Sequence, residues 1–224
     1  MAVINSRALL VGDHLSPPAF DEMTVSILYA QLRAIHDTRQ GGTGSNPDAP
    51  EGRDPKQWLQ TFRNELGLQG WAETGSDVSA DFAPASPEKT TLGLVGKKFT
   101  TPAPLVFGWR LLDPLAGLGM SAAGTFGDAT LDGGPGEKRL VRCRMFAEVG
   151  PGDQGRELSL AFLVLRYPQE PAPGLGSPFD QGTTYWLPAY GYRLNEKRFR
   201  EVRDKITKKI GERLNLVVRA SFQQ

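Results

Sequence analysis

LVRCRMFAEVGPGDQGRELSLAFLVLRY, residues 140–167, is the stretch of sequence that decides the fold. Two sets of side chains alternate along its first part: Val141, Cys143, Met145, Ala147 and Val149 on one face, and Arg142, Arg144, Phe146 and Glu148 on the other. A period of two is typical of a β-strand. We therefore predict a strand over residues 140–149, with the first face buried and the second mostly in contact with water.

The second half of this stretch predicts a partner strand. Residues 157–167 are apolar on both faces, which is the pattern of a central strand covered by the core on one side and by a helix on the other. Residues 150–155 contain three glycines and a proline, and they predict a hairpin loop of the longer type between the two strands. The sequence thus predicts an antiparallel sheet built around this hairpin.

Short apolar or alternating runs surround the hairpin and are separated by Gly, Pro and Asp. They predict further strands at residues 92–95, 105–111, 125–131 and 183–187, and a last strand within residues 214–220. Residues 72–91 are polar and interrupted by prolines, so we expect no regular element there.

The N-terminal part predicts two helices. Ser16 followed by two prolines is typical of a helix start, and residues 19–39 continue without a breaker; the polar arc of this helix includes Ser26 and His36. Asp54 and Pro55 start a second helix that ends near Gly67. The buried stripe of the second helix consists of Trp58, Leu59, Phe62 and Leu66. Residues 40–53 are rich in Gly and Pro, and we expect them to form a mobile loop.

Asn195 is the expected N-cap of a basic amphipathic helix that runs to Ile210. Its apolar stripe is Phe199, Val202, Ile206 and Ile210. The fold class that follows is α+β: an antiparallel β-meander sheet with two N-terminal helices and one C-terminal amphipathic helix packed on it.

We expect residues 1–224 to form a single α+β domain. Its predicted parts are a helical N-terminal part (1–71) with the mobile loop 40–53, an antiparallel β part (92–192), and the C-terminal helix with the last strand (195–220).

Composition limits the classes of function. A formal net charge of +1 gives the whole chain no field that would attract nucleic acid, so we expect no nucleic-acid partner. The single cysteine, Cys143, excludes an internal disulfide. We find no signal peptide and no transmembrane helix, and we expect a cytoplasmic protein or a part of an intracellularly assembled particle. Membrane attachment stays open as an alternative.

The sequence carries no catalytic motif that we recognise. His14, His36 and Cys143 are too few and too scattered for a closed zinc site, so we predict no metal. The glycines at 117 and 119 match part of a dinucleotide-binding pattern, but Asp113 and Pro114 precede them where a strand should end. We therefore predict neither a nucleotide nor any other cofactor, and no catalytic residues.

Two features are candidates for binding. The first is a set of aromatic and basic residues that are common at protein interfaces: Tyr185, Trp186, Tyr190, Tyr192, Arg193, Arg198 and Arg203. The same aromatic side chains are equally suited to anchoring the core. The second is Cys143, which packs as a small apolar side chain in the predicted register but becomes a reactive or lipid-attachment thiol between two arginines if the register shifts by one residue.

The function that these observations favour is a non-enzymatic interaction or assembly protein, such as a structural subunit or adaptor of a larger bacterial or viral complex. Its partners would be other protein subunits, including copies of itself. Two alternatives remain open: a membrane-active or lipid-binding, toxin-like protein, and an enzyme whose site is assembled from scattered residues.

Overall fold

A computed structural model describes residues 2–4, 8–12, 15–38, 55–78, 82–86, 90, 93–95, 129–132, 138–168, 178–211 and 217–219. Its helices are α1 (Pro17–Thr38), α2 (Pro55–Leu68) and α5 (Glu196–Ile210). Its strands are β1 (Ala2–Ile4), β2 (Ala8–Val11), β3 (Trp71–Asp77), β4 (Ala83–Pro84), β5 (Ala129–Asp132), β6 (Lys138–Gly152), β7 (Gly155–Tyr167), β8 (Thr184–Trp186), β9 (Ala189–Leu194) and β10 (Val217–Arg219).

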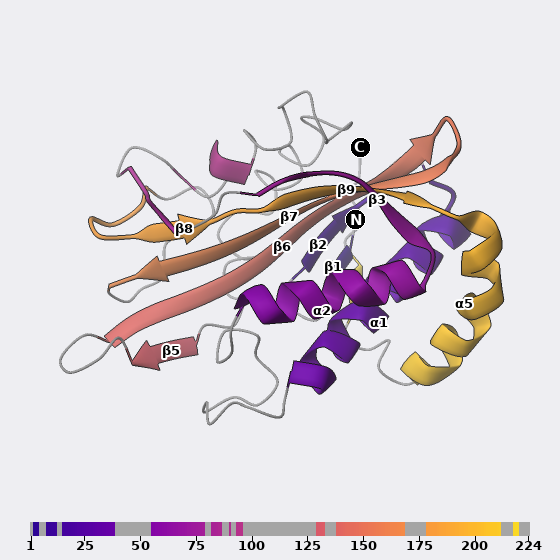
Figure 1. Cartoon of the computed structure of the whole chain (residues 1–224), viewed down its shortest axis with the longest axis horizontal. Helices are drawn as coiled ribbons and strands as arrows, with labels where there is room; N and C mark the ends of the chain where they lie inside the picture. The colour runs from indigo at the N-terminus through magenta and orange to yellow at the C-terminus, as the bar shows by residue number, and fades with distance from the viewer. Residues whose placement is uncertain are drawn as a thin grey trace.

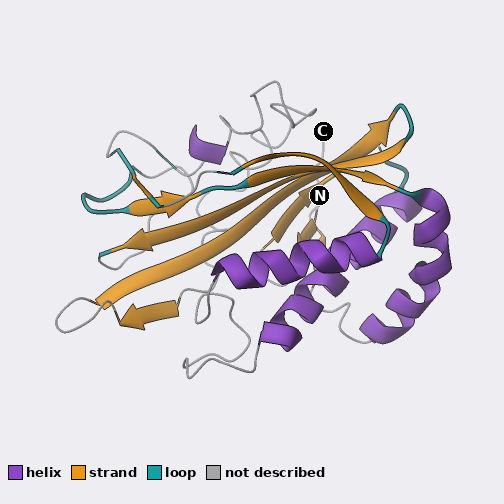
Figure 2. Cartoon of the chain, in the orientation of Figure 1, coloured by secondary structure: helices purple, strands orange, loops and turns teal. Residues whose placement is uncertain are grey.

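All of these strands belong to one twisted sheet, and helices cover one of its faces (Figure 1). The main path through the sheet is β10-β1-β2-β6-β7-β8-β4; in addition β9 pairs with β7, β3 pairs with β9, and β5 pairs with β6. Figure 2 shows α1 and α2 in front of the long strands, with α5 at one end of the sheet. The α+β class with an antiparallel sheet, two N-terminal helices and a C-terminal helix is confirmed.

The hairpin of β6 and β7 is the centre of the sheet. Its register runs antiparallel from Leu140↔Tyr167 to Gly152↔Gly155, so the predicted pairing of these strands is confirmed. The turn is tighter than expected because the strands extend to Gly152 and Gly155. Gly155 has a φ of 131°, and a Cβ there would lie 3.0 Å from the carbonyl oxygen of Leu194, so the turn needs glycine.

The core lies between this hairpin and the helices. Val141, Cys143 and Met145 of β6 point into it, together with apolar residues of α1 and α2. Phe162 of β7 stacks on Trp58 of α2 with ring centroids 5.3 Å apart. The predicted stripe of α2 is buried as expected.

The other face of β6 differs from the expectation. Arg142, Arg144, Phe146 and Glu148 are all at most 4% exposed, so the prediction of a mostly wet face is wrong. An alternating pattern marks two faces, but it does not reveal whether charged side chains on one of them find contacts that permit burial. Arg142, for example, lies 5.7 Å from the ring centre of Tyr167.

Three further details differ from the sequence predictions. Residues 93–95 are helical and not a strand. Residues 72–91, which were expected to lack regular structure, contain β3 and β4. The N-terminal part, expected to be helical, also contributes β1 and β2, and β2 runs parallel to β6. The loop 40–53 and the strand at 105–111 lie outside the described residues.

Candidate interaction surface

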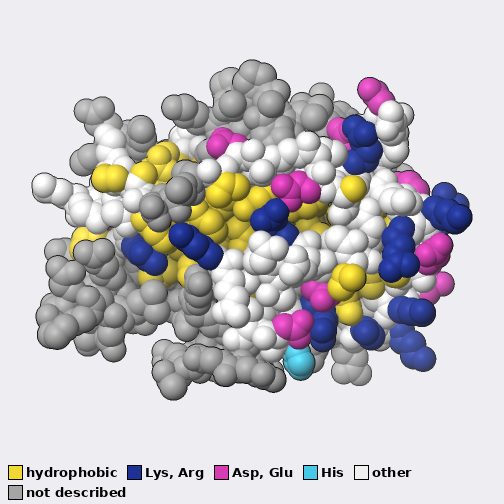
Figure 3. Space-filling view, viewed as in Figure 1, with side chains coloured by type: hydrophobic (Ala, Val, Ile, Leu, Met, Phe, Trp, Pro, Cys, Tyr) yellow, Lys and Arg dark blue, Asp and Glu magenta, His cyan; other side chains and the backbone are white. Residues whose placement is uncertain are grey.

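Helix α5 carries the most highly charged exposed surface among the described helices. Asn195 caps it, because its side chain accepts a hydrogen bond of 3.0 Å from the backbone N–H of Arg198. Phe199, Ile206 and Ile210 are buried against the core. The basic side chains of the helix are Lys197, Arg198, Arg200, Arg203, Lys205, Lys208 and Lys209. Figure 3 shows these Lys and Arg side chains gathered where α5 lies.

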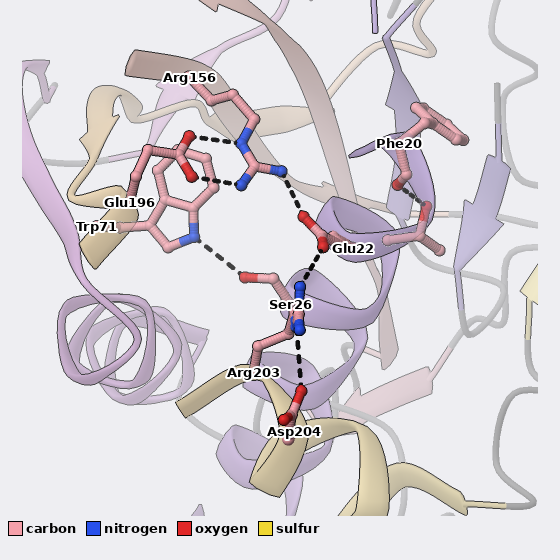
Figure 4. A network of polar contacts seen from close by, with 9 residues as sticks. Phe20, Glu22, Ser26, Trp71, Arg156, Glu196, Arg203 and Asp204 are labelled. Carbon is pink, nitrogen blue, oxygen red and sulfur yellow. Dashed lines mark hydrogen bonds and ion pairs between the residues drawn. The ribbon is translucent and has the colours of Figure 1, made fainter. Parts of the chain in front are cut away.

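A polar network ties α5 to α1 and to the β6–β7 hairpin (Figure 4). Arg156, at the start of β7, is its centre. Its Nε and Nη2 donate to Oε1 and Oε2 of Glu196 at 2.7 and 2.6 Å, and its Nη1 donates to Oε2 of Glu22 at 2.9 Å. Its guanidinium also lies 5.5 Å from the ring centre of Phe199. One arginine thus joins three segments that are far apart in the sequence.

Arg203 extends the network along α5. Its Nη1 donates to Oε1 of Glu22 at 2.9 Å, and its Nε donates to Oδ1 of Asp204 at 3.1 Å. Glu22 therefore bridges two arginines with its two carboxylate oxygens. The hydrogen bonds from Arg156 hold the pKa of Glu196 below its ordinary value.

A groove of 660 Å³ runs beside this network between α1 and α5. Its apolar lining comes from Pro18 and Val25 of α1. The other residues that line it are Asp21, Glu22, Arg203, Asp204, Thr207 and Lys208. The groove is therefore an apolar depression with a charged border, which is the composition of a surface that receives an apolar side chain.

Four cations on α5 form neither an ion pair nor a side-chain hydrogen bond with the described part of the chain: Lys197, Arg200, Lys205 and Lys208. All four are exposed. Arg198 and Arg203, in contrast, are paired with Glu201 and Glu22. The exposed face of α5 therefore retains positive charge that its own acidic residues do not neutralise.

The structure separates the residues that sequence analysis grouped into one binding site. Trp186, Tyr190 and Tyr192 are at most 4% exposed and belong to the core cluster. Tyr185 is half-buried on β8, and Arg193 donates to Gln154 at 2.9 Å and to Glu157 at 3.3 Å. Only Arg198 and Arg203 lie on the surface of α5.

Cys143 lies on the core face of the sheet. Its register partner on β7 is Val164, and the residue is 1% exposed, whereas Arg142 and Arg144 occupy the opposite face. The register is therefore the one in which the thiol packs as an apolar group. Its prediction as a reactive or lipid-attachment thiol gains no support from this position.

Sequence analysis did not identify Arg156 and Glu22 as functional residues. They come from the hairpin and from α1, and only the register of β6 with β7 and the docking of α5 bring them together. The one signal in the sequence was the charged pair Arg156–Glu157 directly after a glycine turn. That signal does not indicate which partners the arginine has.

No group of three or more His, Cys, Asp or Glu residues in the described part of the chain is arranged to hold a metal. The side chain of His36 is 70% exposed and lies 2.9 Å from Asp37. Within the same residues, no helix has both the length and the apolar character needed to cross a membrane.

No model of a known protein family matches the chain, and no curated protein sequence matches it. Among solved structures, the chain is similar to one described as the structure of the Evf virulence factor, with 8% identity and a TM-score of 0.44. That similarity covers 90% of this chain and 77% of the other. A similarity of this size supports no statement about function.

Proposed function

We propose that the chain is a non-enzymatic interaction protein, a structural subunit or adaptor of a larger bacterial or viral assembly, that binds a protein partner through α5. The observation that carries the proposal is the set of four exposed cations on α5 that form neither an ion pair nor a side-chain hydrogen bond with the described residues. They stand beside a groove with an apolar lining. The partner would present acidic side chains around an apolar one that enters the groove.

A protein partner fits this surface better than a lipid bilayer does. An amphipathic helix binds a membrane interface by inserting its apolar face. In α5 that face, formed by Phe199, Ile206 and Ile210, is already buried in the core. Membrane binding would therefore rest on charge alone, and the lipid-binding alternative has less support than the protein interface.

The first prediction tests this surface by charge reversal. The double variant Lys205→Glu/Lys208→Glu should bind the partner at least tenfold more weakly, because each new glutamate would repel the acidic side chains of the partner. Thr207→Trp should weaken binding similarly by filling the groove. The measurement is co-purification of the tagged chain from its own organism in a fixed ratio with a partner, combined with light scattering over a concentration series.

Lys56→Glu, at an exposed position of α2, is the control and should leave the complex unchanged. A protein that is strictly monomeric with no partner in a fixed ratio would contradict the proposal, as would a complex that survives both α5 variants. Flotation with vesicles of phosphatidylcholine and phosphatidylserine tests the membrane alternative. If the wild-type chain binds these vesicles and the α5 double variant does not, the result would favour membrane binding over a protein partner.

A further inference from the structure

A second hollow, of 410 Å³, lies between α2 and β3, away from the α5 surface. The residues that line it include Arg63, Gly67, Leu68, Trp71, Glu73 and Tyr192. Leu68 at its border is 60% exposed, the most exposed large apolar side chain among the described residues. The hollow therefore combines an apolar rim with polar groups.

Tyr192 makes this hollow more than a surface irregularity. The residue is 3% exposed, and its hydroxyl makes no hydrogen bond of ordinary geometry. The guanidinium of Arg63 lies beside this hydroxyl but can only donate, so the hydroxyl proton has no acceptor. Burial raises the pKa of this phenol, so at neutral pH it is protonated and able to donate. A buried polar group without a partner is uncommon in folded proteins, and it points to a ligand that is absent from the free chain.

Arg63 forms the polar cover of the hollow. Its guanidinium lies 4.1 Å from the ring centre of Tyr190 and beside the Tyr192 hydroxyl, its Nη2 donates to Oε2 of Glu73, and its Nε makes no hydrogen bond of ordinary geometry. The Arg63 side chain is 24% exposed, and a part-exposed ion pair or cation–π contact contributes little stability, so its contacts with Glu73 and Tyr190 hold it only weakly. Rotation of this side chain away from Tyr190 would give a ligand access to the Tyr192 hydroxyl.

The chemistry of the lining selects the ligand. Tyr192 and Arg63 offer donors, whereas Glu73 accepts from Arg63 through Oε2 and offers Oε1 as a further acceptor. The opposite charges of Arg63 and Glu73 cancel, so the lining favours a neutral group. A group with an acceptor oxygen, an N–H donor and an apolar substituent meets all of these conditions, and a peptide unit with an apolar side chain is such a group.

We propose that the hollow between α2 and β3 is a binding site for a peptide unit with an apolar side chain, whose carbonyl oxygen accepts a hydrogen bond from Tyr192. The N–H of the peptide donates to Glu73, and its side chain packs on Leu68 and Trp71. This site is independent of the α5 surface and goes beyond the proposed function.

The test uses N-acetyl-leucine methylamide as the probe and the full chain. In a titration followed by two-dimensional ¹⁵N NMR, the amides of Gly67 and Leu68 and the indole of Trp71 should shift together. Tyr192→Phe should weaken binding at least tenfold and leave the midpoint of thermal unfolding equal or higher, because it removes only an unpartnered hydroxyl. Leu68→Ser should weaken binding without changing stability.

Tyr29→Phe removes a phenol hydroxyl on α1 and is the matched control; it should bind like the wild type. Equal affinity of the Tyr192→Phe variant, or shifts that map elsewhere, would overturn the proposal. Binding of N-acetylglucosamine without binding of the leucine amide would overturn the assignment to a peptide. The α5 double variant should bind the probe normally, so failure of the α5 interface leaves this result unaffected.

Discussion

At the scale of single residues, Arg156 is the side chain that joins both α1 and α5 to the β6–β7 hairpin. It is 13% exposed and contacts both Glu22 and Glu196. Charge-assisted hydrogen bonds of this kind are stronger than those between neutral groups. A lysine at this position would lack the planar fork that contacts two carboxylates at once.

We expect Arg156→Met to lower the free energy of unfolding by about 1.5–3 kcal/mol, the range for losing hydrogen bonds to charged groups. Urea unfolding measures this change. Arg198→Met is the control, because its ion pair with Glu201 is more than half exposed on both sides and is worth about 0–1 kcal/mol. Equal losses in the two variants would show that the network gives no special stabilisation.

The same substitution should change the dependence of stability on pH. Arg156 lowers the pKa of Glu196 in the folded state, so the ion pair stabilises the fold above the ordinary glutamate value of 4.5. This stabilisation is lost as the pH falls below that value toward the lowered pKa. The Arg156→Met variant should therefore lose less of its stability than the wild type between neutral and acidic pH.

At the scale of elements, the central strand β7 should tolerate change least. Phe162 is 1% exposed, stacks on Trp58, and meets the ring of Trp186 edge-on at 6.2 Å. Phe162→Ala should cost about 3–5 kcal/mol, because it leaves a cavity between α2 and the sheet. Denaturant unfolding followed by tryptophan fluorescence measures the loss, and Leu68→Ala on the surface should change stability by less than about 0.5 kcal/mol.

The start of α5 gives a second prediction at this scale. Asn195→Ala should lower stability by about 1 kcal/mol, because the backbone N–H of Arg198 loses its acceptor. Asn195→Asp keeps an acceptor oxygen at the cap and should restore most of the loss. Thermal unfolding of both variants tests the cap, and equal destabilisation by Ala and Asp would assign the effect to something else.

The sequence predicted the elements whose signals are local. The caps at Asn195 and before α1 and the stripe of α2 depend on residues a few positions apart, and these helices are confirmed. Ser26 was expected on the polar arc of α1, but it is buried, because its hydroxyl donates to Gln69 and accepts from Trp71. α2 and the start of β3 cover this side of α1, and the periodicity of one helix cannot show which neighbours it has.

At the scale of the whole molecule, the limits of sequence-based prediction follow from long-range pairing. β3 is polar on most of its length and is a strand because it pairs with β9, which periodicity within β3 does not indicate. β2 pairs with β6, from Ala8 beside Met145 to Val11 beside Glu148. In the candidate site, Arg203 was found because the basic helix is a local pattern, whereas Arg156 and Glu22 needed the assembled fold.

The parallel pairing of β2 with β6 also limits the order in which these strands can pair during folding. β1 and β2 can form their own antiparallel pair early, but a two-stranded ribbon alone is only marginally stable in water. Its neighbour on one side is β6, and its neighbour on the other is β10, close to the last described residue. Among the described strands, β1 and β2 are therefore synthesised before both of their outer neighbours, and contacts this distant in sequence make folding slow.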